Sequence, residues 1–177
     1  MVELVDGDVV VREWREDDAE PLAQQANDRA VWIRLRDAFP HPYGIADGRA
    51  FVALARAQAK LPRLFAIQSA GRVAGGIGYY VGKDVERIGA EVGYWLGREF
   101  WGRGIATRAL RMVAQYAFEA EPDLQRLFAV PFADNVASAR VLEKAGFVFE
   151  GTLQRSAIKD GCVQDQWMYA RLRAGEE

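Results

Sequence analysis

The chain has 177 residues, of which 50% are hydrophobic and 27% charged, and its formal net charge is −2. This size and apolar content predict one domain, residues 1–177, around a single sizeable core. Lysine and arginine are scattered among the acids, which argues against a nucleic-acid or membrane-binding surface. One cysteine excludes an intrachain disulfide and a cysteine metal cluster, and one histidine leaves little for a histidine-based metal site. We therefore expect no metal, no signal or spanning segment, and a cytoplasmic setting.

The first third of the chain predicts a strand and two helices. "DVVVREW" over residues 8–14 is a β-type run, and the helix that follows has Asp17 or Asp18 as its N-cap. The stretch "LRDAFPHPYGIADG" over residues 35–48 carries two prolines and two glycines, which predicts a loop. Helical apolar spacing resumes in "ADGRAFVALARAQAK", residues 46–60.

The middle of the chain is rich in strands. Residues 63–70, 72–82 and 87–97 are β-type runs bounded by turn residues. Ala70 and Gly71 form a plausible hairpin tip between the first two runs. The three runs predict an antiparallel meander.

A long amphipathic helix begins after Gly104. Its apolar stripe repeats every four residues, and Pro122 marks its end. The stripe consists of Ile105, Ala109, Val113 and Ala117. One face of this helix is therefore expected to be buried.

The last third of the chain alternates between strands and a short helix. "LQRLFAV", residues 124–130, predicts a strand, and "DNVASARVLEKAGF", residues 134–147, predicts a helix capped by Asp134 or Asn135. Gly146 suits the left-handed position after this helix. Two further strands, in "FVFEGTL" and "CVQDQWMYARL", follow around an Asp-Gly turn. The order of elements predicts an α/β (α+β) domain with a mixed sheet covered by the long helix.

Two glycines at a strand-to-helix junction suggest an anion site. In "EVGYWLGREFWGRGIATRAL", residues 91–110, Gly102 and Gly104 precede the long helix, whose first amides are free to bind an anion. The dinucleotide fingerprint fails because Thr107 stands where its third glycine belongs. A Walker A loop fails because no Gly-Lys-Ser/Thr follows. A glycine pair here is also a common packing device, so both interpretations stay open.

The same stretch, together with "DNVASARVLEKAGF", closely resembles the ribosomal-protein N-acetyltransferase-like branch of the GNAT superfamily. The loop "FPHPYGIADG" and the tail "KDGCVQDQWMYARL" extend the resemblance over nearly the whole chain. The resemblance implies an acetyl-CoA-dependent enzyme with a mostly antiparallel, splayed sheet of about seven strands flanked by helices. In such folds the fourth and fifth strands part to admit the pantetheine arm. The anion would then be the coenzyme A diphosphate.

The resemblance also implies which residues bind acetyl-CoA. The main chain of the fourth strand would pair with pantetheine, the amides of the glycine loop would hold the diphosphate, and the next helix N-terminus would bind near the sulfur. These residues are Tyr94, Trp95, Leu96, Gly102, Arg103, Gly104, Ile105, Ala106, Thr107, Asn135 and Ser138. Glu99 departs from the family's Gln or Arg at the start of the loop, so we exclude its side chain.

Catalysis by this family depends mostly on orientation of an attacking amine. Some members place a tyrosine eight residues after the helix-capping Asn as the acid for the leaving thiolate, and here that position is Glu143. Ser138 is the substitute candidate, and Glu91, on the strand beside the acetyl group, is the candidate base. Simpler interpretations are an N-cap for Asn135, an exposed helix residue for Ser138 and a salt-bridged strand-end acid for Glu91.

The resemblance further implies that the acceptor pocket forms between "WIRLRDAFPHPYG", residues 32–44, and the last hairpin. Its candidate residues are Trp32, Arg34, Phe39, Tyr43 and Asp165. The partner is an amine acceptor, either a protein N-terminal α-amine or a small molecule, and a homodimer stays open. The alternative function is a non-catalytic acetyl-CoA sensor or interaction domain, which the missing tyrosine at Glu143 favours.

Overall fold

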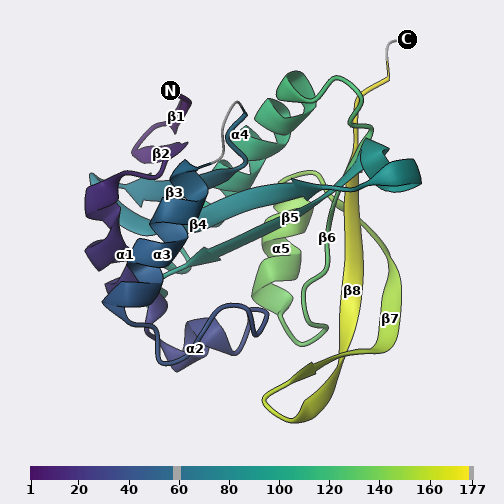
Figure 1. Ribbon diagram of the computed structural model, residues 1–177. Helices are drawn as coiled ribbons and strands as arrows, with labels where there is room; N and C mark the ends of the chain where they lie inside the picture. Colours follow the sequence, from purple (N-terminus) through teal and green to yellow (C-terminus); the bar gives the residue numbers. More distant parts are fainter. Residues whose placement is uncertain (58–60, 176–177) are drawn as a thin grey trace.

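The fold is built on one mixed sheet of eight strands. The computed structural model describes residues 1–57 and 61–175, and within them the strand order is β1-β2-β3-β4-β5-β6-β8-β7 (Figure 1). All neighbouring strands are antiparallel except β5 and β6, which are parallel. The strands are β1 (Glu3–Asp6), β2 (Val9–Glu13), β3 (Leu64–Ser69), β4 (Arg72–Val81), β5 (Gly89–Leu96), β6 (Arg126–Ala129), β7 (Val148–Lys159) and β8 (Cys162–Leu172).

The sheet has one strand more than the seven or so expected. The additional strand is β1, which pairs with β2 around a turn at Gly7, where φ is +60°. Its four residues are mostly exposed, so they lack the alternating pattern from which strands are predicted. The antiparallel meander of β3, β4 and β5 is confirmed, with Ala70 and Gly71 at positive φ in its first turn.

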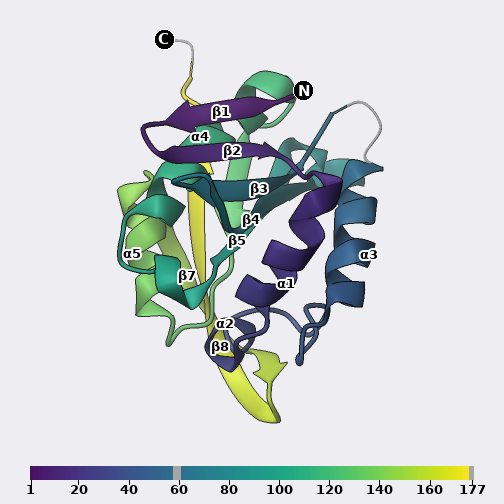
Figure 2. The same ribbon diagram turned by 90° about the vertical axis from the view of Figure 1, so that its left-hand side faces the viewer.

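Helices cover both faces of the sheet. Along β3 the side chains alternate between two cores, because Leu64 and Ala66 pack with α1 and α3 while Phe65 and Ile67 pack with α4. Figure 2 shows α1 and α3 together in front of the sheet. The helices are α1 (Ala19–Ala26), α2 (Arg29–Trp32), α3 (Ile45–Arg56), α4 (Ile105–Ala120) and α5 (Val136–Lys144), with 3₁₀ turns η1 (Glu16–Asp18), η2 (Asp84–Ile88) and η3 (Arg98–Phe100). Residues 58–60 of the helix predicted over 46–60 lie outside the described residues.

The long helix α4 buries the predicted stripe. The four stripe residues from Ile105 to Ala117 are at most 1% exposed and belong to the larger core. The helix ends at Ala120, two residues before Pro122, as the sequence predicts. Within the described part of the chain, no helix is long and apolar enough to cross a membrane.

The short helix α5 also ends as predicted. Gly146 has φ +85°, the amide of Phe147 donates to the carbonyl of Leu142 and the amide of Gly146 donates to that of Glu143, both at 3.0 Å. These two bonds are the Schellman pattern, which satisfies the last carbonyls of a helix. The pattern returns Phe147 to the core, where it is 3% exposed.

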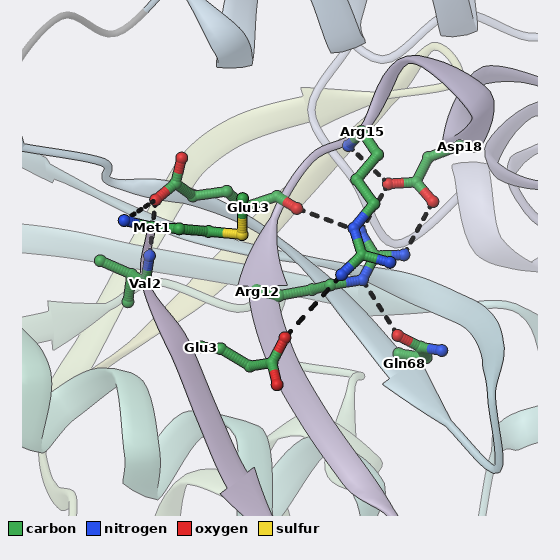
Figure 3. Close-up of polar contacts among 8 residues, drawn as sticks. All are labelled: Met1, Val2, Glu3, Arg12, Glu13, Arg15, Asp18 and Gln68. Atoms are coloured by element: carbon green, nitrogen blue, oxygen red, sulfur yellow. Dashed lines mark hydrogen bonds and ion pairs between the residues drawn. The ribbon is translucent and has the colours of Figure 1, made fainter.

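A buried ion pair sets the direction in which the chain leaves β2 for α1. The guanidinium of Arg12 donates to both carboxylate oxygens of Asp18 at 2.7 and 2.8 Å, and each residue is 4% exposed (Figure 3). Asp18 also accepts from the backbone amide of Arg15, while Arg12 Nε donates to Gln68 on β3. Because both buried charges are paired and hydrogen-bonded, the turn between strand and helix has one favoured geometry.

Candidate active site

The sheet opens between β5 and β6. These strands pair only from Gly89 and Arg126 to Glu91 and Phe128, and β5 then continues to Leu96 without a strand partner on that side among the described residues. The chain beyond β6 follows β8 instead, since Trp167 N donates to the Pro131 carbonyl at 2.9 Å. In Figure 1 the two strands diverge and α5 is visible between them. The resulting edge of β5 has no strand partner and is open to an extended ligand, and its Leu96 carbonyl oxygen accepts from the indole Nε1 of Trp101 at 2.8 Å.

The side chains of β5 alternate between the two faces of this opening. Tyr94 points toward α5, where its hydroxyl meets Ser138. Trp95 packs on the other face against Phe39, with ring centroids 5.3 Å apart. Gly93 lies on the same face as Trp95, and a Cβ added there would meet no atom within 4 Å. That face therefore has open space between Glu91 and Trp95.

The glycine loop lies where β5 runs into α4. Gly102 and Gly104 have φ of +74° and +73°, and neither would crowd a neighbour if it carried a Cβ. Glycine is therefore required here for backbone conformation and not for close packing. The first hydrogen bond of α4 runs from Arg108 N to the Gly104 carbonyl. The amides of residues 105–107 therefore have no acceptor within the helix and point out of its N-terminus. Such amides, at the positive end of a 16-residue helix, suit an anion.

The acid in the glycine loop is neutralised by its neighbours. Glu99 Oε1 accepts from Arg72 and from Gln25, each at 2.8 Å. The hydrogen bond from Arg72 holds the pKa of Glu99 below its ordinary value. The guanidiniums of Arg72 and Arg103 also lie over the ring of Phe100, at 5.2 and 5.9 Å from its centroid. The departure from Gln or Arg therefore does not leave an unpaired acid beside the loop.

The N-terminus of α5 contacts the face of β5 on which Tyr94 lies. Asn135 is the N-cap, and its side-chain oxygen accepts from the amide of Ser138 at 3.2 Å. The hydroxyl of Tyr94 lies 2.8 Å from Ser138 Oγ and 3.2 Å from the Ser138 carbonyl oxygen. Desolvation raises the pKa of Tyr94 above its ordinary value. The N-cap interpretation of Asn135 is confirmed, and Ser138 is half-buried with its hydroxyl already engaged.

Glu91 has a salt bridge of the kind that the simpler interpretation expects. Its carboxylate pairs with the guanidinium of Arg36 from the loop after α2. The Glu91 side chain is 30% exposed, so water reaches it. The Glu91 carboxylate thus lies on the open face of β5 with both an arginine partner and access to water.

The loop after α2 and the last hairpin meet, as predicted for an acceptor pocket. Lys159 Nζ lies 3.8 Å from the ring centroid of Trp32 and 2.8 Å from Asp37 Oδ1, and its side chain is only 2% exposed. Arg34 pairs with Asp134 at 2.6 Å, which ties the loop to the start of α5. Lys159 was not predicted from the sequence, because nothing in its local pattern distinguishes it from an exposed lysine beside a turn.

The other two acceptor candidates, Tyr43 and Asp165, also have partners within the protein. Tyr43 is 5% exposed and packs on Phe39 at 4.8 Å between ring centroids, and burial raises the pKa of Tyr43 to about 12. Asp165 accepts from the backbone amide of Arg155, which has φ +52° at a register shift of β7. Phe39 contacts Trp95 of β5 and Arg34 pairs with Asp134 before α5, so these two candidates reach elements that border the opening. The carbonyl of Asp165 accepts from the amide of Ala133, in the same segment before α5.

Comparison with known proteins gives the family. The model of the acetyltransferase (GNAT) domain matches residues 8–148, and the chain belongs to this family. The chain is 40% identical over 88 residues to the probable N-acetyltransferase YjcK of Bacillus subtilis. The matched residues cover 50% of this chain and 48% of that protein. It is 34% identical over 84 residues to the ribosomal-protein-serine acetyltransferase of Escherichia coli, 47% of this chain and 46% of that protein. The chain thus spans about half the length of the curated relatives it matches.

A solved structure extends the likeness to almost the whole chain. RimJ of Mycobacterium smegmatis, in complex with CoA-disulfide, superimposes with a TM-score of 0.80 and 26% identity, over 93% of this chain and 81% of that one. The expected fold, a mixed sheet flanked by helices, is confirmed by the topology and by this likeness.

Proposed function

We propose that the protein transfers the acetyl group of acetyl-CoA to a primary amine, by direct attack of the amine on the thioester. The observation that carries the proposal is the unpaired edge of β5, which leads directly to the glycine loop and the free amides of α4. An extended arm that ends in a diphosphate fits this pair of features, since a strand edge pairs with amides and a helix N-terminus binds anions. The coenzyme A complex of the RimJ relative supports the same assignment.

The residues of this chain would divide the work as follows. The main chain of Tyr94, Trp95 and Leu96 pairs with the pantetheine amides, and the amides from Gly102 to Thr107 hold the diphosphate. A β5 amide stabilises the oxyanion that forms when the amine attacks. Bound acetyl-CoA supplies the activated acyl group.

Glu91, through water, accepts the proton that the amine nitrogen loses. An α-amine, with a pKa of about 8, needs little help, whereas a lysine amine near 10.4 needs the base. The half-exposed carboxylate beside the open face at Gly93 is suited to either acceptor. The acceptor is a protein N-terminal α-amine or a small-molecule amine, and the ribosomal-protein-serine acetyltransferase among the relatives favours a protein acceptor.

The test is an acetyl transfer assay with a panel of amines. The protein is incubated with acetyl-CoA and N-terminal peptides, lysine peptides, polyamines or aminoglycosides, and free thiol and the mass of one added acetyl group are recorded. An acetylated product that requires Glu91 supports the transferase. Binding of acetyl-CoA without thiol release for any amine would instead support the sensor alternative.

A further inference from the structure

A lysine ammonium is buried where the last hairpin meets the segment after α2, residues 33–41. Lys159, at the end of β7, has a side chain that is only 2% exposed. Its Nζ lies 2.8 Å from Asp37 Oδ1 and 3.8 Å from the ring centroid of Trp32. Lysine normally extends its charged end into water and is rarely buried to this degree unless the charge is paired. Here a carboxylate and an aromatic face, from α2 and the segment that follows it, hold the ammonium.

The contact of Lys159 differs in burial from a neighbouring ion pair between the same parts of the chain. Arg29, at the start of α2, pairs with Asp160 in the hairpin turn at 2.6 Å, but both side chains are about half-exposed. Exposed ion pairs are screened by water and contribute little to stability. A cation over an aromatic ring is held more strongly when water is excluded from it, as it is at Lys159. Lys159 is therefore the stronger of these two connections between the hairpin and the α2 region.

The segment after α2 also contacts the strand that borders the opening. Arg36 pairs with Glu91 of β5, and Phe39 packs edge-on against Trp95 of the same strand, with ring centroids 5.3 Å apart. These two contacts lie on either side of the open space on β5, so the segment lines that space. Asp37, which the buried ammonium binds, lies between Arg36 and Phe39 in the sequence. A displacement of Asp37 would therefore move both side chains that line the open space.

We propose that Lys159 is a positioning residue that holds the segment after α2 against the last hairpin and thereby sets the affinity for the amine acceptor. The inference rests on the proposed function, in which the amine reaches the thioester from the open face of β5. Lys159 acts through Asp37 and Trp32 and supplies no reacting atom. A loosened segment lines the open space correctly in a smaller fraction of molecules, and the apparent affinity for the amine falls by that fraction.

The kinetic test compares the wild type with Lys159→Met, which keeps an apolar stem of similar length and removes the ammonium. Steady-state kinetics use acetyl-CoA and the amine of the panel that the wild type acetylates fastest. The KM for the amine should rise about 10-fold while kcat stays within about twofold, because the segment binds the amine and the reacting groups lie elsewhere. The affinity for coenzyme A, measured by calorimetry, should also stay within about twofold.

Hydrogen exchange tests the position of the segment without any acceptor. The amides of Leu35 and Phe39 donate to the carbonyls of Trp32 and Arg36, each at 3.0 Å, and report on whether the segment keeps its fold. In Lys159→Met these amides should exchange about 10-fold faster than in the wild type. The amides of α4, on the other face of the sheet, should keep their protection.

Asp160→Asn is the matched control, because it removes one charge from the exposed ion pair between the same parts of the chain. Asp160 has φ +50°, a conformation that asparagine also tolerates, so the turn keeps its shape. The amine KM of this variant should stay within about twofold of the wild type, with unchanged exchange in the segment.

A second variant tests the same contact from its exposed side. Asp37→Asn removes the charge that pairs with Lys159, while its amide oxygen still accepts a hydrogen bond, so the amine KM should rise only about threefold. The double variant Lys159→Met/Asp37→Asn should match Lys159→Met within about twofold, because the two side chains act on each other.

The outcomes distinguish this inference from the proposed function. A wild type that acetylates no amine would overturn both. Transfer by the wild type with the same amine KM in Lys159→Met would overturn the inference alone, as would an equal rise in Asp160→Asn. A loss of kcat or of coenzyme A affinity without a change in the amine KM would show a general structural role and would also overturn it. If Lys159→Met does not fold, Asp37→Asn replaces it, and an unchanged amine KM and exchange rate there would count against the positioning role.

Discussion

The carboxylate of Glu91 on β5 pairs with the guanidinium of Arg36 from the loop after α2. This contact joins the strand that borders the opening to the segment expected to bind the acceptor. Arg34 makes a second such connection to Asp134, before α5. Two ion pairs therefore join the segment after α2 to the elements that border the opening, and the candidate base is one of the four partners.

Glu91→Gln should slow transfer to lysine amines more than transfer to α-amines. General base catalysis contributes about 100-fold or more, and the lysine amine depends on it more because its pKa is about 10.4, against about 8 for an α-amine. We expect kcat/KM to fall about 100-fold for a lysine peptide and about 10-fold or less for an N-terminal peptide. Glu86→Gln, an exposed acid in η2, is the control. Equal losses for both acceptors would remove Glu91 from the base role.

Gly93→Val should block the acceptor side of the site while sparing acetyl-CoA. The added side chain would occupy the open space between Glu91 and Trp95, on the face opposite Tyr94. Turnover should fall about 10-fold or more through misplacement of the amine, with coenzyme A affinity within about twofold. Gly151→Val, on β7 with similar free space, should change neither quantity. Calorimetry measures the coenzyme A affinity and steady-state kinetics the turnover. A loss of both in Gly93→Val would show that the coenzyme occupies this space and would contradict the prediction.

Gly104→Ala should cost both stability and coenzyme affinity. Alanine at φ +73° is strained by about 1 kcal/mol, and the strain would displace the first amides of α4. Gly71→Ala introduces the same strain at φ +77° in a hairpin tip with no atom near its Cβ. Both variants should lose about 1 kcal/mol in chemical denaturation, but only Gly104→Ala should weaken coenzyme A binding, by about 10-fold. Similar affinities in the two variants would argue against the diphosphate site.

Arg12→Met should destabilise the fold strongly. It would leave the 4%-exposed carboxylate of Asp18 without its bidentate partner, and breaking a buried pair costs about 3 kcal/mol or more. Arg15→Met is the control, because its pair with Glu3 is exposed and 3.8 Å long and should contribute at most about 0.5 kcal/mol. Urea unfolding with equal midpoints for the two variants would contradict this account.

Glu99 should add stability that disappears in acid. The pKa of Glu99 is lowered in the folded state, mainly by the hydrogen bond from Arg72. Its contribution to the free energy of unfolding is therefore fully present above the unfolded-state pKa of about 4.3. This contribution is lost as the pH falls through the folded-state pKa. The difference in melting temperature between the wild type and Glu99→Gln should therefore narrow below about pH 4. A difference that stays constant through this range would mean that the pair with Arg72 does not form in solution.

The elements with strong local signals were predicted from the sequence, and the long-range contacts were not. Gly146 predicted the end of α5 because a left-handed residue after a helix is a local requirement. Asp165 stays a predicted acceptor residue, and only the structure shows that its carboxylate accepts from the backbone amide of Arg155 in the same hairpin. The burial of Lys159 could not be predicted, because it depends on Trp32 and Asp37, more than 100 residues earlier in the chain.

The sequence by itself determined α3, α4 and α5, the N-cap at Asn135, the turns at Ala70–Gly71 and Asp160–Gly161 and the glycine loop, because each depends on the backbone preferences of a few neighbouring residues. It predicted one helix in the stretch up to Trp32, where the structure has α1 and a separate α2 that begins after Asp28. Only the tertiary structure decided that β5 and β6 part after Glu91 and that Tyr94 meets Ser138 across the opening. Strand partners and side-chain contacts between distant segments depend on register and packing over the whole sheet, which no local pattern encodes.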